Sequence, residues 1–246
     1  MNIKKYLENP EEIRRDAYVI AMYKKLEDQK VCGYFSDVND EIFYAYNIYA
    51  FPIIGLDFHI LKFSNEKNIC DPINATLTYL KTKKCPIIYS SKFFVLDDYC
   101  KKFNELLAKN TQKNIVKDKD IRKYLDENYK EEFSKQRYEN AKELSKKINV
   151  LIDRLYESDL EDNYVFKLAF YIKFLPEYDD RIAILNKALE KASVTNKKHA
   201  FLKANCPYGI CDKLKGKKII KAKEDSKISF KHCIYGENKK YTTYKE

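Results

Sequence analysis

The chain has 246 residues, of which 45% are hydrophobic, and a formal net charge of +10. This length and composition exclude a disordered tail and allow one large domain or two small ones with a buried core. No apolar run approaches the roughly 20 residues that span a bilayer, and the charged amino-terminal stretch lacks the apolar region of a signal peptide. We therefore expect a cytoplasmic protein with no membrane partner.

The positive charge comes mainly from lysines, which are mixed with Glu and Asp along the predicted helices. No motif of the known nucleic-acid-binding folds is present. A solvated lysine surface is therefore favoured over a nucleic-acid-binding one.

Helices and strands alternate over the first 110 residues. Apolar residues at helical spacing predict a helix over 11–28, and an apolar, β-branched run predicts a buried strand over 48–55. Single helices between successive strands favour a parallel sheet with helices on both faces. The further strands are expected at 30–36 and 85–91, and the further helices at 37–47, 71–83 and 92–110.

Three residues are expected near the edge of this sheet where ligands bind, which is the carboxyl end of the strands. Cys70 stands directly before the helix expected from residue 71, and Ser90 and Ser91 end the strand expected at 85–91. Ser90 and Ser91 are therefore candidate cofactor-binding residues.

The second half of the chain has a different pattern. Residues 118–192 are helical in pattern, with a break at Pro176, and strand signals return afterwards. The fold class is therefore α/β, with a parallel-sheet lobe at 1–110, a helical section at 111–195 and a reduced second α/β lobe at 196–246.

The seven cysteines are odd in number and contain no CxxC pair, so reduced cysteines are expected. Cys70 precedes Asp71, a predicted N-cap, and Pro72, a predicted first helical residue; the positive end of that helix would stabilise a thiolate. Cys206 and Cys211 form a C-x4-C spacing. Cys70, Cys206 and Cys211 are the candidate metal ligands, because thiolates near helix amino termini suit iron–sulfur clusters.

Two stretches together resemble the subunits of 2-hydroxyacyl-CoA dehydratases and benzoyl-CoA reductases. The stretch "GYFSDVNDEIFYAYNIYAFPIIG" at 33–55 is similar to that family's strand, helix and strand, and "ICDPINATLTYLKTKKCPIIYSSKFFVLDDY" at 69–99 is similar to the stretch that follows. The segment at 199–222 is similar to the opening of the family's second lobe. The matching residues in the first stretch are Val38, Glu41, Ile42, Tyr44, Ala45, Pro52 and Gly55.

The resemblance implies two Rossmann-like lobes with a helical insert and an oxygen-sensitive [4Fe-4S] cluster held by three cysteines. It implies a lyase that acts on an acyl-CoA with a second dehydratase subunit and an ATP-dependent activator, which supplies one electron so that a ketyl radical loses water. Cys70 matches the first cluster ligand. The second ligand position falls near Ser91–Phe93, where there is no cysteine, and the third would lie late in the reduced second lobe, so that Cys206 or Cys211 would have to substitute.

Two other functions remain open at this point. One is a shortened, non-catalytic relative that keeps the fold for partner binding or assembly. The other, less favoured, is a basic nucleic-acid-binding protein.

Overall fold

A computed structural model describes residues 2–35, 39–66, 69, 71–97 and 100–193. The chain divides into two compact units, of which the first is Asp16–Ala141 and the second joins Met1–Arg15 to Lys142–Glu246. The general α/β class is confirmed, because a four-stranded parallel sheet is accompanied by helices.

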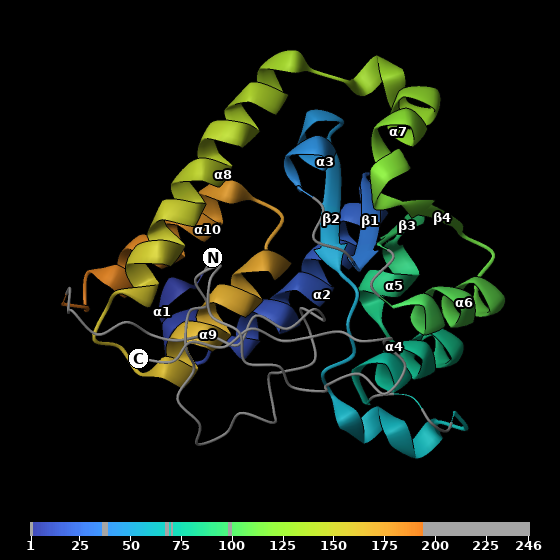
Figure 1. The fold of residues 1–246 in the computed structure, drawn as a ribbon, viewed down its shortest axis with the longest axis horizontal. Helices are drawn as coiled ribbons and strands as arrows, with labels where there is room; N and C mark the ends of the chain where they lie inside the picture. Colours follow the sequence, from blue (N-terminus) through green and yellow to red (C-terminus); the bar gives the residue numbers. More distant parts are fainter. Residues whose placement is uncertain (1, 36–38, 67–68, 70, 98–99, 194–246) are drawn as a thin grey trace, which may run out of the picture. The chain divides into compact units, whose positions relative to one another are not determined.

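The sheet belongs to the unit Asp16–Ala141. Its strands are β1 (Lys30–Phe35), β2 (Ile48–Pro52), β3 (Phe93–Leu96) and β4 (Asn114–Lys117). All neighbours are parallel and the order is β2-β1-β3-β4, so the sheet grows in opposite directions from β1 and β3 (Figure 1). Cys32 of β1 is in register with Ala50 of β2 and with Phe93 of β3.

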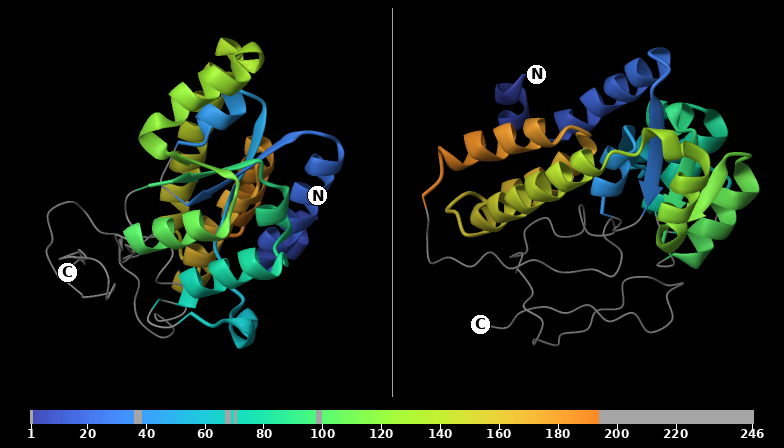
Figure 2. Two further views of the ribbon diagram at one scale, coloured as in Figure 1. Left: turned by 90° about the vertical axis from the view of Figure 1, so that its right-hand side faces the viewer. Right: turned by 90° about the horizontal axis from the view of Figure 1, so that it is seen from above.

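The helices that lie wholly or mostly in this unit are α2 (Glu11–Leu26), α3 (Glu41–Ala45), α4 (Asp71–Thr82), α5 (Pro86–Ser90), α6 (Lys101–Asn110) and α7 (Ile121–Tyr129). Short 3-10 turns are η1 (Phe58–Phe63), η2 (Asp118–Asp120) and η3 (Lys130–Glu132). Figure 2 shows the strands from two further sides, with α4, α5 and α6 beside them in cyan and green.

Alternation of side chains explains how the sheet is covered. Successive strand residues point to opposite faces, and Cys32 and Phe93 share a buried cluster with Phe43 of α3 and Leu125 of α7. On the other face, the ring of Phe35 lies 4.6 Å from that of Phe103 of α6. The sheet is therefore packed on both faces, as the sequence predicts.

Gly33 of β1 marks the tightest packing on that second face. A Cβ atom at Gly33 would lie 2.6 Å from Ile53 and 2.9 Å from Phe94. Real Cβ atoms do not approach carbon atoms so closely, so only glycine fits without a shift of its neighbours.

The structure corrects the sequence prediction around β3. The expected strand at 85–91 is the short helix α5, which Pro86 opens at its first position, where a proline is tolerated. The expected helix at 92–110 begins only at Lys101, because Phe93–Leu96 form the fully buried β3. β4 was not predicted; it continues the sheet beyond residue 110, where the sequence pattern ends the first lobe.

The second unit is helical in its described part. It contains α1 (Ile3–Glu8), most of α8 (Lys135–Tyr156), α9 (Asp162–Tyr171), the turn η4 (Ile172–Phe174) and α10 (Tyr178–Leu189). The predicted break at Pro176 is confirmed, because η4 ends before it and α10 begins after it. The predicted lobe at 196–246 lies outside the described residues.

Candidate functional site at the carboxyl edge of the sheet

The order of the strands places a topological switch point between β1 and β3. In open parallel sheets the chain leaves two such neighbouring strands in opposite directions, and the crevice outside their carboxyl ends is where ligands bind. The segments that leave β1 and β3 are described only in part, since 36–38 and 98–99 lie outside the described residues. Asp97 and Cys100 are the described residues that follow β3 most closely.

Asp97 fixes the end of β3 to its neighbours. It is buried, its backbone N–H donates to the carbonyl of Phe35 at 3.3 Å, and its own carbonyl accepts from Asn104 Nδ2 at 2.6 Å. The end of β3 is thereby held both to the end of β1 and to the first turn of α6.

Cys100 occupies the N-cap position of α6 and is half-buried. Its carbonyl accepts the backbone N–H of Asn104 at 3.0 Å, the first bond of the helix. The first turn of α6 contains Lys101 and Lys102 and no acidic residue. The helix dipole and these charges both favour a thiolate at Cys100.

The start of α4 lies close to the end of β2. The N–H of Gly55 donates to Thr76 Oγ1 at 2.7 Å, and a Cβ atom at Gly55 would lie 2.6 Å from the backbone of Ala75. α4 begins at Asp71, so the predicted helix start is confirmed, although Asp71 is itself helical. Cys70 precedes it directly in the chain and lies outside the described residues.

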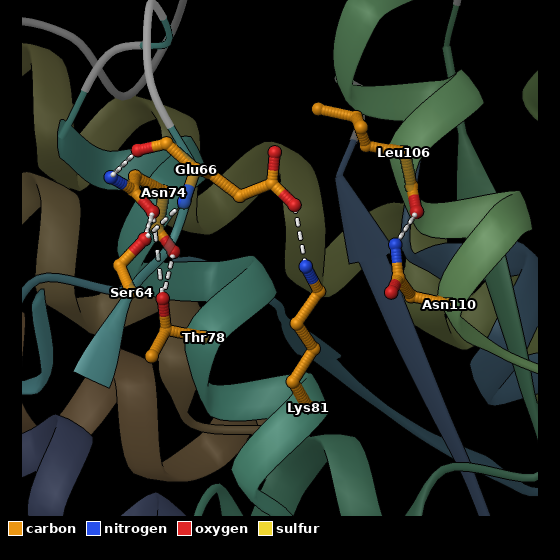
Figure 3. Close-up of polar contacts among 7 residues, drawn as sticks. All are labelled: Ser64, Glu66, Asn74, Thr78, Lys81, Leu106 and Asn110. Atoms are coloured by element: carbon orange, nitrogen blue, oxygen red, sulfur yellow. Dashed lines mark hydrogen bonds and ion pairs between the residues drawn. The ribbon is translucent and has the colours of Figure 1, made fainter.

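Polar contacts fasten the loop that leads from β2 to α4 (Figure 3). Asn74 Nδ2 donates to the carbonyl of Glu66 at 3.4 Å, and the Ser64 hydroxyl contacts Asn74 Oδ1. Lys81 Nζ lies 2.5 Å from Glu66 Oε1. These contacts hold the described part of the loop, up to Glu66, against α4.

Ser90 and Ser91 do not lie at this edge, so their predicted position is wrong. They precede β3 instead of ending it, and the next residue, Lys92, donates its backbone N–H to the carbonyl of Val31 near the start of β1. Both serines are buried, and Ser91 Oγ donates to the carbonyl of Ile87 at 2.8 Å. They stabilise the amino end of the sheet.

The other described cysteines are placed differently from Cys100. Cys32 is completely buried on β1, and desolvation raises the pKa of its thiol well above the usual range, so it is a core residue. Cys85 opens α5, the helix that leads into the amino end of β3. Cys206 and Cys211 lie outside the described residues.

Within the described ranges, no three His, Cys, Asp or Glu side chains are grouped closely enough to hold a metal ion. The described part of the carboxyl edge offers one thiol, Cys100. A cluster bound there would therefore take its further ligands from cysteines such as Cys70 that lie outside the described residues.

Sequence reasoning missed Cys100 because it placed the strand eight residues too early. The signal that could have found it is the run Phe93–Leu96, four large apolar residues followed by two aspartates. A buried strand of a parallel sheet has this appearance.

Comparisons with models of known protein families and with characterised proteins found no match for this chain. Among the described helices, none has the length and apolar character needed to cross a membrane.

Proposed function

We propose that this chain is an iron–sulfur subunit of the 2-hydroxyacyl-CoA dehydratase type, in which Cys70 and Cys100 are cluster ligands. The observation that carries the proposal is the position of Cys100, four residues after the end of β3 and at the N-cap of α6. The resemblance implies a ligand cysteine before one crossover helix and a second near the end of the next strand. The second position is expected near Ser91–Phe93 for a strand at 85–91, and it moves toward Cys100 because the strand is β3. Cys70 precedes α4, β3 is the next strand, and Cys100 follows it.

The neighbourhood of the two helix starts supports this pairing. α4 and α6 contact each other, and each of them follows a strand of the same parallel sheet. Two helix amino termini at one edge provide positive potential for a negatively charged thiolate cluster. The third ligand that the resemblance implies lies late in the second lobe, so Cys206 or Cys211 would have to substitute for it.

Each described residue has a separate part in this proposal. Asn104 positions the start of α6 by its bond to the carbonyl of Asp97. Gly55 lets α4 approach the end of β2. When bound, the cluster supplies one-electron transfer, and the acyl-CoA, the second subunit and the ATP-dependent activator are the partners that the resemblance implies.

The test is anaerobic purification of the full chain, followed by iron and sulfide analysis. We expect a brown protein with about four irons and four sulfides per chain, the content of one [4Fe-4S] cluster. Cys70→Ala and Cys100→Ala should each lose most of this iron, because each removes a thiolate ligand.

Cys85→Ala is the matched control, because Cys85 is also half-buried and also opens a helix, yet it precedes β3. It should keep its iron. A colourless, iron-free wild-type protein after anaerobic reconstitution would contradict the proposal, and so would equal iron in the Cys100→Ala and Cys85→Ala variants.

A second candidate function, nucleic-acid binding, is favoured by the distribution of charge along the sequence. Residues 194–246 hold 14 of the 47 basic residues but only 5 of the 37 acidic ones, which is nine of the ten net positive charges. Six lysines and no acidic residue lie between 213 and 223. A cluster of this kind attracts phosphate backbones.

This candidate is tested by binding of a DNA or RNA oligonucleotide to the full chain at increasing salt. Phosphate contacts predict an affinity that falls steeply with salt and a shallower fall in a Lys217→Gln/Lys218→Gln variant. Lys4→Gln/Lys123→Gln removes two well-exposed lysines elsewhere and should change neither value. Binding that is absent or independent of salt would exclude this function.

A further inference from the structure

We infer that the exposed ring of Phe63 and the lysines beside it bind single-stranded nucleic acid, with one base stacked on the ring and the neighbouring phosphates at the lysines. The inference rests on the second candidate function, nucleic-acid binding, and is independent of the iron–sulfur proposal. It adds a contact surface in the unit Asp16–Ala141 to the basic residues at 194–246.

Phe63, the last residue of η1, presents an aromatic ring beside two lysines. Its exposed fraction is 50%, and the centre of its ring lies 4.3 Å from Lys84 Nζ and 5.1 Å from Lys62 Nζ. Neither ammonium group has a hydrogen bond or an ion pair within the described residues. The ring and both positive charges are therefore available to a ligand.

The turn after α4 holds Lys83 and Lys84 in place. The backbone N–H of Lys83 donates to the carbonyl of Leu80, and that of Lys84 donates to the carbonyl of Tyr79, both at 3.2 Å, which is the hydrogen-bond pattern of a Schellman motif. Lys83 has a φ of 55°, in the left-handed region that favours glycine. Two exposed lysines thus follow each other in a fixed turn, and the second of them reaches Phe63.

The chemistry of this surface favours a single strand over a duplex or a membrane. An aromatic ring stacks on any base, and positive charges beside it attract the phosphates that flank that base. In a duplex each base is already stacked and paired, so the ring could reach one only at the cost of unstacking it. In a membrane, insertion of the ring would carry Lys84 Nζ, 4.3 Å from its centre, toward the acyl chains, where a charge is costly.

Tyr89 has a similar aromatic ring with a lysine beside it, but the lysines there already have partners. Its exposed fraction is 52%, and Lys25 Nζ lies 3.4 Å from the centre of its ring. Lys25 and Lys113 both donate to the carbonyl of Tyr89, at 3.5 and 2.9 Å. Because these ammonium groups are held by the backbone, Tyr89 is the matched control for Phe63.

The test is binding of a labelled oligothymidylate of about 12 nucleotides to the full chain at several salt concentrations, with a duplex of the same length for comparison. We expect tighter binding of the single strand. Phe63→Ala should weaken it about tenfold without changing the salt dependence, because stacking releases no counterions. Lys84→Gln should reduce the slope of log affinity against log salt by about 0.7, the value for one phosphate of a single strand. Lys83→Gly should do the same without loss of stability, because glycine readily adopts the conformation of this turn.

Tyr89→Ala should change neither the affinity for the single strand nor its salt dependence. A wild-type chain that binds the single strand, with equal affinity in Phe63→Ala, would overturn this inference and leave the candidate function to residues 194–246. Equal weakening by Phe63→Ala and Tyr89→Ala would overturn it as well. A wild-type chain that binds no oligonucleotide would overturn the candidate function together with the inference, and binding to phosphatidylserine vesicles that Phe63→Ala abolishes would then assign the surface to a membrane.

Discussion

The two edges of the sheet use their polar groups differently. At the amino end, Ser91 Oγ donates to the carbonyl of Ile87, and Lys113 Nζ donates to the carbonyls of Ile88, Tyr89 and Ser91. These bonds complete the end of α5, whose last carbonyls have no partners within the helix. At the carboxyl end, the polar bonds position two helix starts and leave a thiol at one of them. The first edge is built for stability, and the second is where the proposed cluster would bind.

Substitution of two tightly packed glycines, Gly55 and Gly33, should have the largest effects on stability and should differ in its effect on bound iron. Gly55→Ala would push a methyl group against the backbone of α4, and overpacking of this kind lowers the free energy of unfolding by about 1–3 kcal/mol. It should also reduce bound iron, because it displaces the start of α4. Gly33→Ala should lower stability by about 1–2 kcal/mol but keep the iron, because its methyl group meets side chains and not the backbone of α4. Chemical unfolding and iron analysis check both variants, and equal iron in the two would remove the distinction.

The pH dependence of the free energy of unfolding tests the amino end of the sheet separately from the carboxyl end. Burial, and then the charge of Lys25, lower the pKa of Lys113 from 10.5 to about 8. Between these two values the unfolded chain binds a proton that the folded chain does not. The contribution of Lys113 to the free energy of unfolding should therefore rise with pH across this window.

The measurement is chemical unfolding of the wild type and Lys113→Met from pH 7.5 to pH 10.5. We expect the difference in unfolding free energy, wild type minus variant, to increase with pH, while their iron contents stay equal. Parallel pH curves would show that Lys113 titrates normally.

Two asparagines on α6 provide the smallest and most closely matched comparison. Asn104 Nδ2 donates to Asp97 at the start of the helix, and Asn110 Nδ2 donates to the carbonyl of Leu106 at its end, at 2.7 Å (Figure 3). Each substitution by Ala should cost about 1 kcal/mol of stability, the usual value of one hydrogen bond. Only Asn104→Ala should also lower the iron content. Loss of iron in both variants would point to a general effect of destabilising α6.

The sequence pattern found the elements whose local signals and tertiary environment agree. β1, β2 and α4 are marked by apolar runs with clear ends, and the parallel sheet follows from their alternation. It failed at α5, since Pro-Ile-Ile-Tyr has the composition of a strand while Pro86 at the first position permits a helix. The sequence pattern does not predict β4, because only Val116 of its four residues is buried.

The error at α5 carried over to the site. A strand at 85–91 puts Ser90 and Ser91 at the ligand edge and leaves Cys100 inside the helix expected at 92–110. The true strand moves the serines to the opposite edge and places Cys100 at a helix start. An error in the position of one short strand therefore changes which residues are expected at the carboxyl end of the sheet.

The iron content of Cys100→Ala and Cys85→Ala, purified side by side without oxygen, tests the central claim most directly. Both substitutions remove a half-buried cysteine that opens a helix, one after β3 and one before it. The proposal predicts that Cys100→Ala loses most of its iron and that Cys85→Ala retains it. Equal iron in the two variants, or none in the wild type after reconstitution, would contradict it.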